Sequence, residues 1–243
     1  MKVLLVGVIA LYFIILFFRL AKSKRASENG DVNEQYRLGC MYTELGKTEK
    51  AEKYLKLASE QGHIEAQTTL GLLYYDQNKL DLAEKYFKLV SEEGGVIEAY
   101  DVLGKIYISQ EKYNLAEEAY KIAIGKGYKK SLFSLGVLYL KLENLDLAEK
   151  YLKLASEQGN VEAHGALGLL YVNQDKYDLA EKYLILGSKN ENPQVLLSLG
   201  LLYYDQNKHD LAIKYLKLAS KKGFKKADES LKHLYGINKE EWF

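Results

Sequence analysis

A Leu-Gly pair recurs six times along the chain, and this repeat limits what the chain can fold into. The pairs are Leu38-Gly39, Leu70-Gly71, Leu103-Gly104, Leu135-Gly136, Leu167-Gly168 and Leu199-Gly200. Successive pairs are 32, 33, 32, 32 and 32 residues apart. A fixed period in this range is typical of stacked repeats, in which each unit buries its apolar face against its neighbours. The sequence therefore predicts a repeat array without one central core.

Each repeat is predicted to contain two helices, called A and B, joined by a polar turn. Ten residues after most of the glycines an Asp or Asn recurs, as at Asp81, and we expect it to be the N-cap of helix B because its side chain accepts bonds from first-turn amides. A glycine such as Gly62 predicts the end of helix B, since Gly readily adopts the left-handed conformation found there. The fifth repeat lacks this glycine and has the stretch 190–193 in its place.

The repeated glycine lies inside helix A, where it costs about 1 kcal/mol relative to Ala. Six such glycines predict a close crossing of helices A and B, with the Ala twelve residues later as the small partner on helix B. The Tyr three residues after each glycine is predicted to pack between helices, with its hydroxyl reaching the surface. A ladder of tyrosines that stacks on a ligand is the functional alternative. The alanines are Ala51, Ala83, Ala116, Ala148, Ala180 and Ala212, and the tyrosines are Tyr42, Tyr74, Tyr107, Tyr139, Tyr171 and Tyr203.

The repeated pattern consists of Leu-Gly-x-x-Tyr, the Ala twelve residues after the glycine, and a further small residue seven after that Ala, such as Ala58 or Ala155. This pattern resembles the tetratricopeptide repeat. The stretch 58–74 is similar to its Sel1-like subfamily. The resemblance covers about residues 32–235 and implies an all-α fold, a right-handed α-solenoid of six antiparallel helix pairs that binds partner proteins or peptides. Residues 227–235 match helix A with Lys232 in place of the glycine, which predicts a C-terminal capping helix.

An apolar run of sixteen residues, 3–18, precedes the repeats. As a helix it would be about 24 Å long, and Arg19 can snorkel so that the following residues complete a membrane span. Lys and Arg after the run predict that its C-terminal side stays in the cytoplasm. A cleaved secretory signal, with a site near Ala21-Lys22-Ser23, and a peripheral hydrophobic tail are the alternatives.

These features predict four segments. Residues 1–22 are an N-terminal transmembrane signal anchor, 23–31 a polar linker, 32–223 six repeats, and 224–243 a capping helix and tail. The tail ends in Trp242-Phe243 and either folds back onto the apolar face of the cap or is displayed as a peptide.

Composition and motifs exclude several classes of function. The 34 basic and 33 acidic residues leave a net charge of +1, which argues against nucleic acid as a partner. The single Cys40 excludes an internal disulfide framework and a thiolate zinc cluster. The four histidines lack metal-ligand spacing. Gly46-Lys47-Thr48 resembles the end of a phosphate-binding loop, but Met41 stands where that motif needs Gly. The sequence predicts no catalytic residue, metal or cofactor.

The family resemblance implies that helix A lines a concave groove, partly through the residues one and four positions after each glycine. Here these residues are mostly apolar, and Phe133 and Leu197, three positions before the glycine, extend the set. Together they predict a stripe that accepts an amphipathic helix or an extended peptide. The alternative is that a tightly wound array buries the stripe. The predicted partner-binding residues are Leu72, Tyr75, Ile108, Phe133, Val137, Leu140, Leu169, Val172, Leu197, Leu201 and Tyr204.

The resulting hypothesis is a membrane-tethered repeat scaffold, a single-pass membrane protein with its repeats in the cytoplasm, which binds a protein partner and has no chemistry of its own. An exported protein with a cleaved signal, secreted or periplasmic, is the main alternative. An accessory subunit that regulates a membrane enzyme is a third. Lys-, Asn-, Tyr- and Ile-rich usage suggests a bacterial source.

Overall fold

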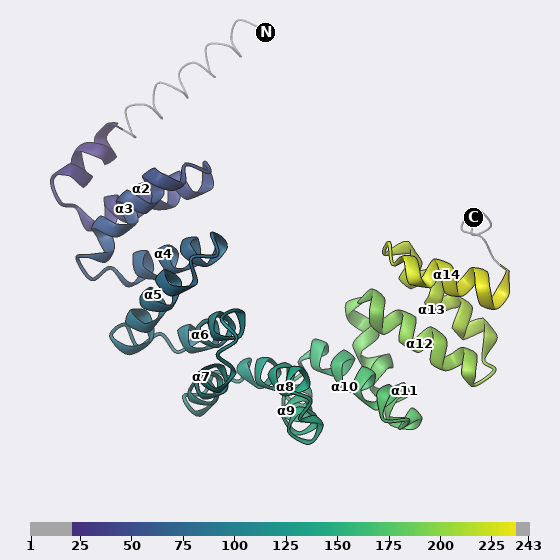
Figure 1. The fold of residues 1–243 in the computed structure, drawn as a ribbon. Helices are drawn as coiled ribbons and strands as arrows, with labels where there is room; N and C mark the ends of the chain where they lie inside the picture. Colours follow the sequence, from purple (N-terminus) through teal and green to yellow (C-terminus); the bar gives the residue numbers. More distant parts are fainter. Residues whose placement is uncertain (1–20, 237–243) are drawn as a thin grey trace, which may run out of the picture. The chain divides into compact units, whose positions relative to one another are not determined.

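The computed structural model describes residues 21–236, and every regular element in that range is helical (Figure 1). The chain forms two compact units, which meet inside α7 between Ala119 and Tyr120. The elements are α2 (Val32–Glu44), α3 (Thr48–Ser59), α4 (Ile64–Asp76), α5 (Leu80–Glu92), α6 (Glu98–Ser109), α7 (Tyr113–Gly125), α8 (Ser131–Lys141), α9 (Leu145–Glu157), α10 (Val161–Asn173), α11 (Tyr177–Gly187), the 3-10 helix η1 (Ser188–Asn190), α12 (Pro193–Asp205), α13 (His209–Lys221) and α14 (Lys225–Tyr235).

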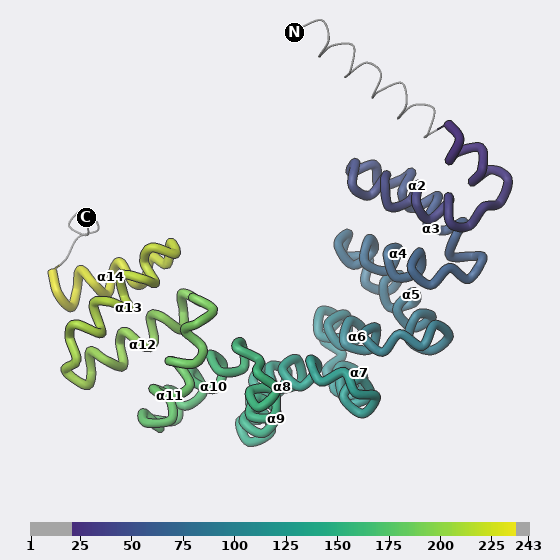
Figure 2. The backbone as a smooth tube through the Cα atoms, turned by 180° about the vertical axis from the view of Figure 1, so that it is seen from behind, coloured from purple at the N-terminus to yellow at the C-terminus, as the bar shows by residue number. Residues whose placement is uncertain are grey.

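Within each unit, consecutive helices pack side by side. In the first unit α2 to α6 contact one another in chain order, and in the second unit α8 to α14 do the same (Figure 2). Even-numbered helices are the A helices of the repeats, and they also contact each other directly: α2 with α4, and α10 with both α8 and α12. The all-α solenoid predicted from the repeat period is therefore confirmed within each unit.

The prediction of an N-terminal transmembrane helix is wrong for the part of the chain that the structure describes. No helix within residues 21–236 is long and apolar enough to cross a membrane. Where the description begins, residues 21–28 are helical and include Lys22, Lys24 and Arg25, whose charges are costly in a hydrocarbon core. Residues 1–20, where the rest of that prediction falls, lie outside the described residues, as does the predicted Trp242-Phe243 tail. The single-pass location with cytoplasmic repeats is overturned together with the helix.

The helix crossing predicted from the repeated glycine is present, but its partner is a different residue. A Cβ atom added to Gly168 would lie 2.7 Å from Leu184 Cγ and 2.9 Å from the Leu184 backbone nitrogen. Gly39, Gly136 and Gly200 meet the Leu sixteen residues later in the same way. The Ala twelve residues after the glycine is fully buried nearby, as at Ala180. The close approach is thus between the backbone of helix A and a leucine on helix B.

Helix B begins two residues earlier than the sequence predicted. In α5 the N-cap is Lys79, and the expected cap Asp81 lies in the first turn instead. A carboxylate there is favoured by the positive end of the helix dipole. The shift is explained by the residue just before the N-cap, seven positions after the repeated glycine. It has a left-handed φ of 57–65° in all six repeats, so the chain turns into helix B earlier than an Asp cap would allow. These residues are Gly46, Asn78, Glu111, Glu143, Asp175 and Asn207.

Adjacent repeats are joined by a carboxylate that accepts the hydroxyl of the next tyrosine. Tyr171 Oη donates to Glu149 Oε1 (2.9 Å), and Lys153 Nζ lies 2.6 Å from the same oxygen. Tyr74, Glu52 and Lys56 repeat the arrangement at 2.8 and 2.6 Å. Burial, and then the neighbouring carboxylate, raise the pKa of Tyr74 and of Tyr171 to about 12. The tyrosines are therefore part of the packing between repeats, as the sequence predicted. Their hydroxyls do not reach the surface as expected: Tyr74 and Tyr171 are fully buried, and each hydroxyl binds a carboxylate.

Candidate functional site

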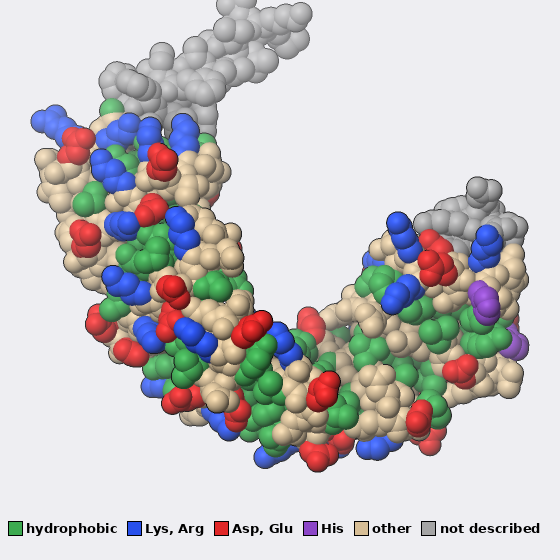
Figure 3. All heavy atoms as spheres, viewed as in Figure 1, with side chains coloured by type: hydrophobic (Ala, Val, Ile, Leu, Met, Phe, Trp, Pro, Cys, Tyr) green, Lys and Arg blue, Asp and Glu red, His purple; other side chains and the backbone are tan. Residues whose placement is uncertain are grey.

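The predicted partner-binding residues lie on five A helices and differ in exposure. Leu72 and Val137 are exposed by 45% and 39%, whereas Leu197 is buried. The other eight are half-buried. On the face of the second unit seen in Figure 3, hydrophobic side chains form patches between scattered charges. In the second unit, these residues contribute to hollows of the surface: Phe133 and Leu169 line one, and Leu197 and Leu201 line another.

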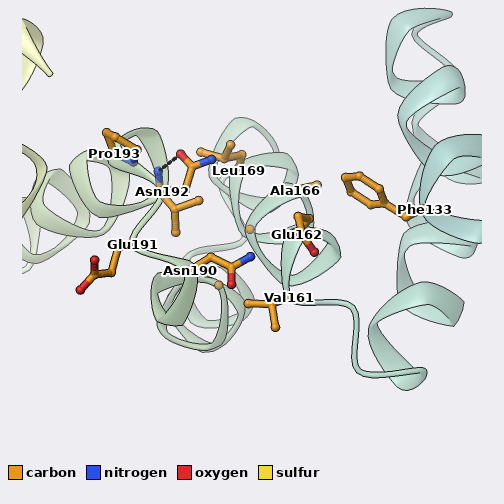
Figure 4. A pocket seen from close by; sticks show the side chains of 12 residues that line it. Phe133, Val161, Glu162, Ala166, Leu169, Asn190, Glu191, Asn192 and Pro193 are labelled. Atoms are coloured by element: carbon orange, nitrogen blue, oxygen red, sulfur yellow. Dashed lines mark hydrogen bonds between the residues drawn. The ribbon is translucent and has the colours of Figure 1, made fainter. Parts of the chain in front are cut away.

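The hollow that contains Phe133 and Leu169 is a cavity of about 600 Å³ at the fifth repeat, called here the repeat-five cavity. Phe133 reaches it from α8 and points toward Ala166 and Glu162 of α10 (Figure 4). Its size falls within the usual range of ligand pockets, about 300–1,000 Å³. It is lined by Phe133, Val161, Glu162, Gly165, Ala166, Leu169, Gly187, Asn190, Glu191, Asn192, Pro193 and Val195.

Two glycines found only in this repeat shape the cavity. Three residues before the repeated glycine, the fifth repeat has Gly165, where the neighbouring repeats have Phe133 and Leu197. At the end of helix B it has Gly187, where Ala155 stands one repeat earlier. A Cβ atom on Gly187 would lie 2.6 Å from the Gly165 backbone nitrogen, so α10 and α11 touch backbone to backbone. A Cβ atom on Gly165 would lie 2.8 Å from Val195 Cγ2, so Val195 of α12 packs against the bare backbone of α10 at this wall of the cavity.

The connection after α11 forms one rim of the cavity. The short helix η1 occupies the start of this connection, and Glu191 takes the left-handed φ of 50° that a glycine adopts in the other repeats. The Glu191 carboxylate pairs with Lys222. Asn192 Oδ1 then caps α12 by accepting from the amide nitrogen of Gln194 (2.9 Å), and Pro193 occupies the first helical turn. The rim is therefore held by an ion pair and a helix cap.

A second hollow adjoins the repeat-five cavity and is called here the basic hollow. It measures about 480 Å³ and shares Val161, Glu162 and Asn190 with the cavity. Lys129 and Lys130 line its other side. The two hollows thus combine an apolar end around Phe133 with a cationic end.

The charges at the two hollows have identifiable partners. Lys129 Nζ donates to Gln158 Oε1 (3.2 Å), and Lys130 Nζ lies 5.9 Å from the centroid of the Tyr128 ring. Beside the cavity, burial and the nearby Lys189 lower the pKa of His164, so its imidazole is neutral at pH 7. Because the charge of Glu191 is paired with Lys222, the remaining charged side chains that line the two hollows are Lys129, Lys130 and Glu162, with a net charge of +1.

Sequence reasoning found Phe133 and Leu169 but missed most residues of this site. Val161, Glu162 and Ala166 follow no rule of spacing from the repeated glycine. One signal was available: the fifth repeat departs from the others at Gly165, at Gly187 and in the stretch 190–193. The sequence interpretation read that stretch only as a helix boundary.

The sequence matches family models described as tetratricopeptide repeat. One model matches residues 102–163 and 166–223, and a second matches residues 35–60 and 64–92. Among curated proteins, none matches the sequence.

Solved structures share the fold. The c5321 antigen of uropathogenic Escherichia coli, which displays a Sel1-like repeat fold, is 21% identical with a TM-score of 0.68 over 89% of this chain, which spans about half (52%) of that protein. PilF of Pseudomonas aeruginosa is 18% identical with a TM-score of 0.65, over 86% of this chain and 94% of PilF. YrrB, a tetratricopeptide repeat protein with an unusual peptide-binding site, is 22% identical with a TM-score of 0.51, over 68% and 90% of the two chains.

At these identities the likeness shows the fold, and the predicted Sel1-like resemblance is confirmed at that level. The family matches together span most of the chain and agree with the helix pairs of both units. The chain belongs to the tetratricopeptide repeat family.

Proposed function

We propose that this chain is a scaffold that holds a protein partner on its A-helix face and performs no chemistry of its own. The binding part would be the repeats, residues 32–223, with residues 224–243 closing the array. Tetratricopeptide repeats are suited to protein–protein interaction, and proteins of this family are generally non-enzymatic scaffolds. Stacked repeats of this kind offer extended surfaces rather than enclosed active sites.

The observation that carries this proposal is the repeat-five cavity and the apolar residues around it. Phe133, Leu169 and Ala166 meet there from two A helices, and Leu201 lies on the next A helix. A concave, mostly apolar hollow with a few polar groups at its rim is the usual form of a recognition site. The peptide-binding site reported for YrrB supports a peptide as the type of ligand.

The partner segment would be an amphipathic helix or an extended peptide. Both modes insert apolar side chains into an apolar groove, and the polar side of the segment remains in water. Only a few such side chains carry most of the binding energy, and they concentrate in desolvated pockets. The repeat-five cavity is the place where we expect such an anchoring side chain.

The proposal is tested by affinity capture with the full chain as bait, using an extract of its own source. Leu169→Asp and Leu201→Asp place a charge on the A-helix face, so the captured partner should be lost or reduced at least tenfold. Leu154→Asp and Leu179→Asp are matched controls on helix B, since these leucines are exposed by 37% and 39%. They should leave capture unchanged.

Far-UV circular dichroism would establish that all four variants fold. If the helix B variants lose the partner and the A-helix variants keep it, the binding surface lies on the other side of the repeats. If none of the four changes capture, the proposal that either face holds the partner is wrong.

A further inference from the structure

We infer that the repeat-five cavity and the basic hollow together bind an acidic–aromatic peptide segment of a partner protein. In such a segment, acidic residues lie one or two positions away from a large apolar side chain. This inference rests on the proposed function and specifies the chemistry of the partner. Three features of the site support it: the size of the apolar end, the charge of the other end, and the path between them.

The apolar end fits one large side chain. Phe133 forms one wall, Ala166 and Leu169 lie opposite on α10, and Val195 and Pro193 belong to α12. Aromatic side chains bury about 150–250 Å² each, so they gain more than small aliphatic ones from such a hollow. Val195 fills the place that a side chain at position 165 would take, and the hollow lies beside this contact. An anchoring Trp or Phe in this hollow would lie beside Phe133 and Leu169.

The other end attracts an acid. Lys129 and Lys130 are both exposed, and the partners that the structure gives them, Gln158 and the Tyr128 ring, are uncharged. An incoming carboxylate would therefore gain two charge-assisted contacts without breaking an existing ion pair. A lysine or arginine at the same place would face both cations across a short distance. Charge complementarity thus favours an acidic segment over a basic one.

The path between the two ends is short and continuous. Val161, Glu162 and Asn190 line both hollows, so one peptide can pass from one to the other. Of the two acids at the cavity, Glu191 is already neutralised by Lys222. Glu162 is the remaining acid, and it is outnumbered by the two lysines. The local field along the path therefore still favours acidic residues at the end near Lys129.

The test uses labelled synthetic peptides and the full chain, with binding followed by fluorescence anisotropy. The first probe is Gly-Ser-Glu-Glu-Ala-Trp-Ser-Gly. A second probe has Lys-Lys in place of Glu-Glu, and a third has Ala in place of Trp. We expect the first probe to bind at least tenfold more tightly than either of the others at low salt. Its advantage over the second probe should shrink as salt is raised, because the lysines are exposed.

Variants of the chain locate the site. The double substitution Lys129→Glu and Lys130→Glu should reverse the preference between the first two probes. Lys221→Glu with Lys225→Glu is the matched control, since these lysines are exposed and line neither hollow, and the affinity should stay within twofold. Ala166→Phe should fill the cavity and weaken the first probe at least tenfold. Ala166→Leu replaces it if the larger side chain prevents folding.

Several results would overturn the inference. Equal binding of the acidic and basic probes would remove the charge argument, and no binding of any probe would remove the site. Residues 240–243 of this chain, Glu-Glu-Trp-Phe, have the expected composition. If deleting residues 237–243 tightened the first probe at least tenfold, the occupant would be this segment and not a partner. Leu201 does not line either hollow, so partner capture that depends on Leu201 alone would preserve the proposed function and reject this inference.

Discussion

Replacing Gly168 by Ala tests whether the helix crossing, and not the conformational freedom of glycine, explains the repeat. In an unhindered helix, Gly→Ala stabilises by up to about 1 kcal/mol. At this position the new Cβ atom would lie 2.7 Å from Leu184 Cγ and 2.9 Å from the Leu184 backbone nitrogen. Because one of the two atoms is backbone, rotation of the leucine alone does not relieve the contact, and α11 has to move.

The expected size of the effect follows from these two terms. Overpacking a tight core costs about 1–3 kcal/mol, and the backbone contact places this site at the upper end of that range. After subtracting the helix-propensity gain, we expect Gly168→Ala to lower the free energy of unfolding by about 2 kcal/mol. The measurement is urea denaturation of the full chain, followed by far-UV circular dichroism.

Gly125 provides a matched control with the opposite expectation. It ends α7 with an ordinary helical φ, and a Cβ atom there would meet no atom within 4 Å. Gly125→Ala should therefore leave stability unchanged or raise it by up to about 1 kcal/mol. A Gly168→Ala chain as stable as the parent would refute the packing argument for the four glycines that meet a leucine in this way, Gly39, Gly136, Gly168 and Gly200.

Three further predictions concern the links and turns of the array. Tyr171→Phe should lower the free energy of unfolding by about 1 kcal/mol, since it removes a hydroxyl bonded to a carboxylate; Tyr177→Phe, on the surface, should leave the urea midpoint unchanged. Lys153 lowers the pKa of Glu149, so the ionised carboxylate contributes its full stability above the ordinary Glu pKa of about 4.3, and this stability is lost as pH falls through the pKa of the folded protein. Glu149→Gln should therefore make the urea midpoint depend less on pH in the acid range. A pH dependence equal to that of the parent would contradict this prediction. Glu143 has a left-handed φ of 57°, a conformation that Asn tolerates better than Glu. Glu143→Asn should therefore stabilise the fold by up to about 0.5 kcal/mol, measured as a rise in the thermal midpoint. A lower midpoint would contradict this prediction.

The sequence predicted the stacking of repeats, the two helices of each repeat and the close crossing of helices A and B, because each of these depends on a pattern that occurs six times. The partner at the crossing was wrong for a physical reason. Choosing Ala180 for Gly168 assumed that two small residues must meet, whereas a leucine side chain from helix B lies against the bare backbone of helix A. The N-cap prediction was wrong because the left-handed residue before helix B reverses the chain earlier than an Asp cap requires.

The candidate site was predicted less completely, because the exposure of an A-helix side chain depends on whether the next helix along the chain covers it. Leu197 and Leu72 occupy comparable faces of their A helices, but Leu197 is buried in a cluster that includes Ala227 and Leu231 of α14. The repeat-five cavity depends on a meeting of Gly165 and Gly187, on different helices, and no periodic pattern signals it because only one repeat has both.

The carboxylate-to-tyrosine link between repeats also has a direction. In the links at Tyr74, Tyr107 and Tyr171, the acceptor comes from one repeat and the donor from the next, so a repeat followed by a copy of itself forms the link only if it carries the acid. The first five repeats do, but the sixth has Ile213 in that place, half-buried beside α14. The Tyr235 hydroxyl of α14 lies instead 3.1 Å from His209 Nδ1.

A duplication of one whole repeat within the first five would therefore supply both halves of a new link and lengthen the protein without a mismatch. Duplication of the sixth would place a tyrosine hydroxyl against isoleucine. Changes in repeat number during evolution of this chain are therefore expected to occur ahead of α12, with the sixth repeat and α14 inherited as one block.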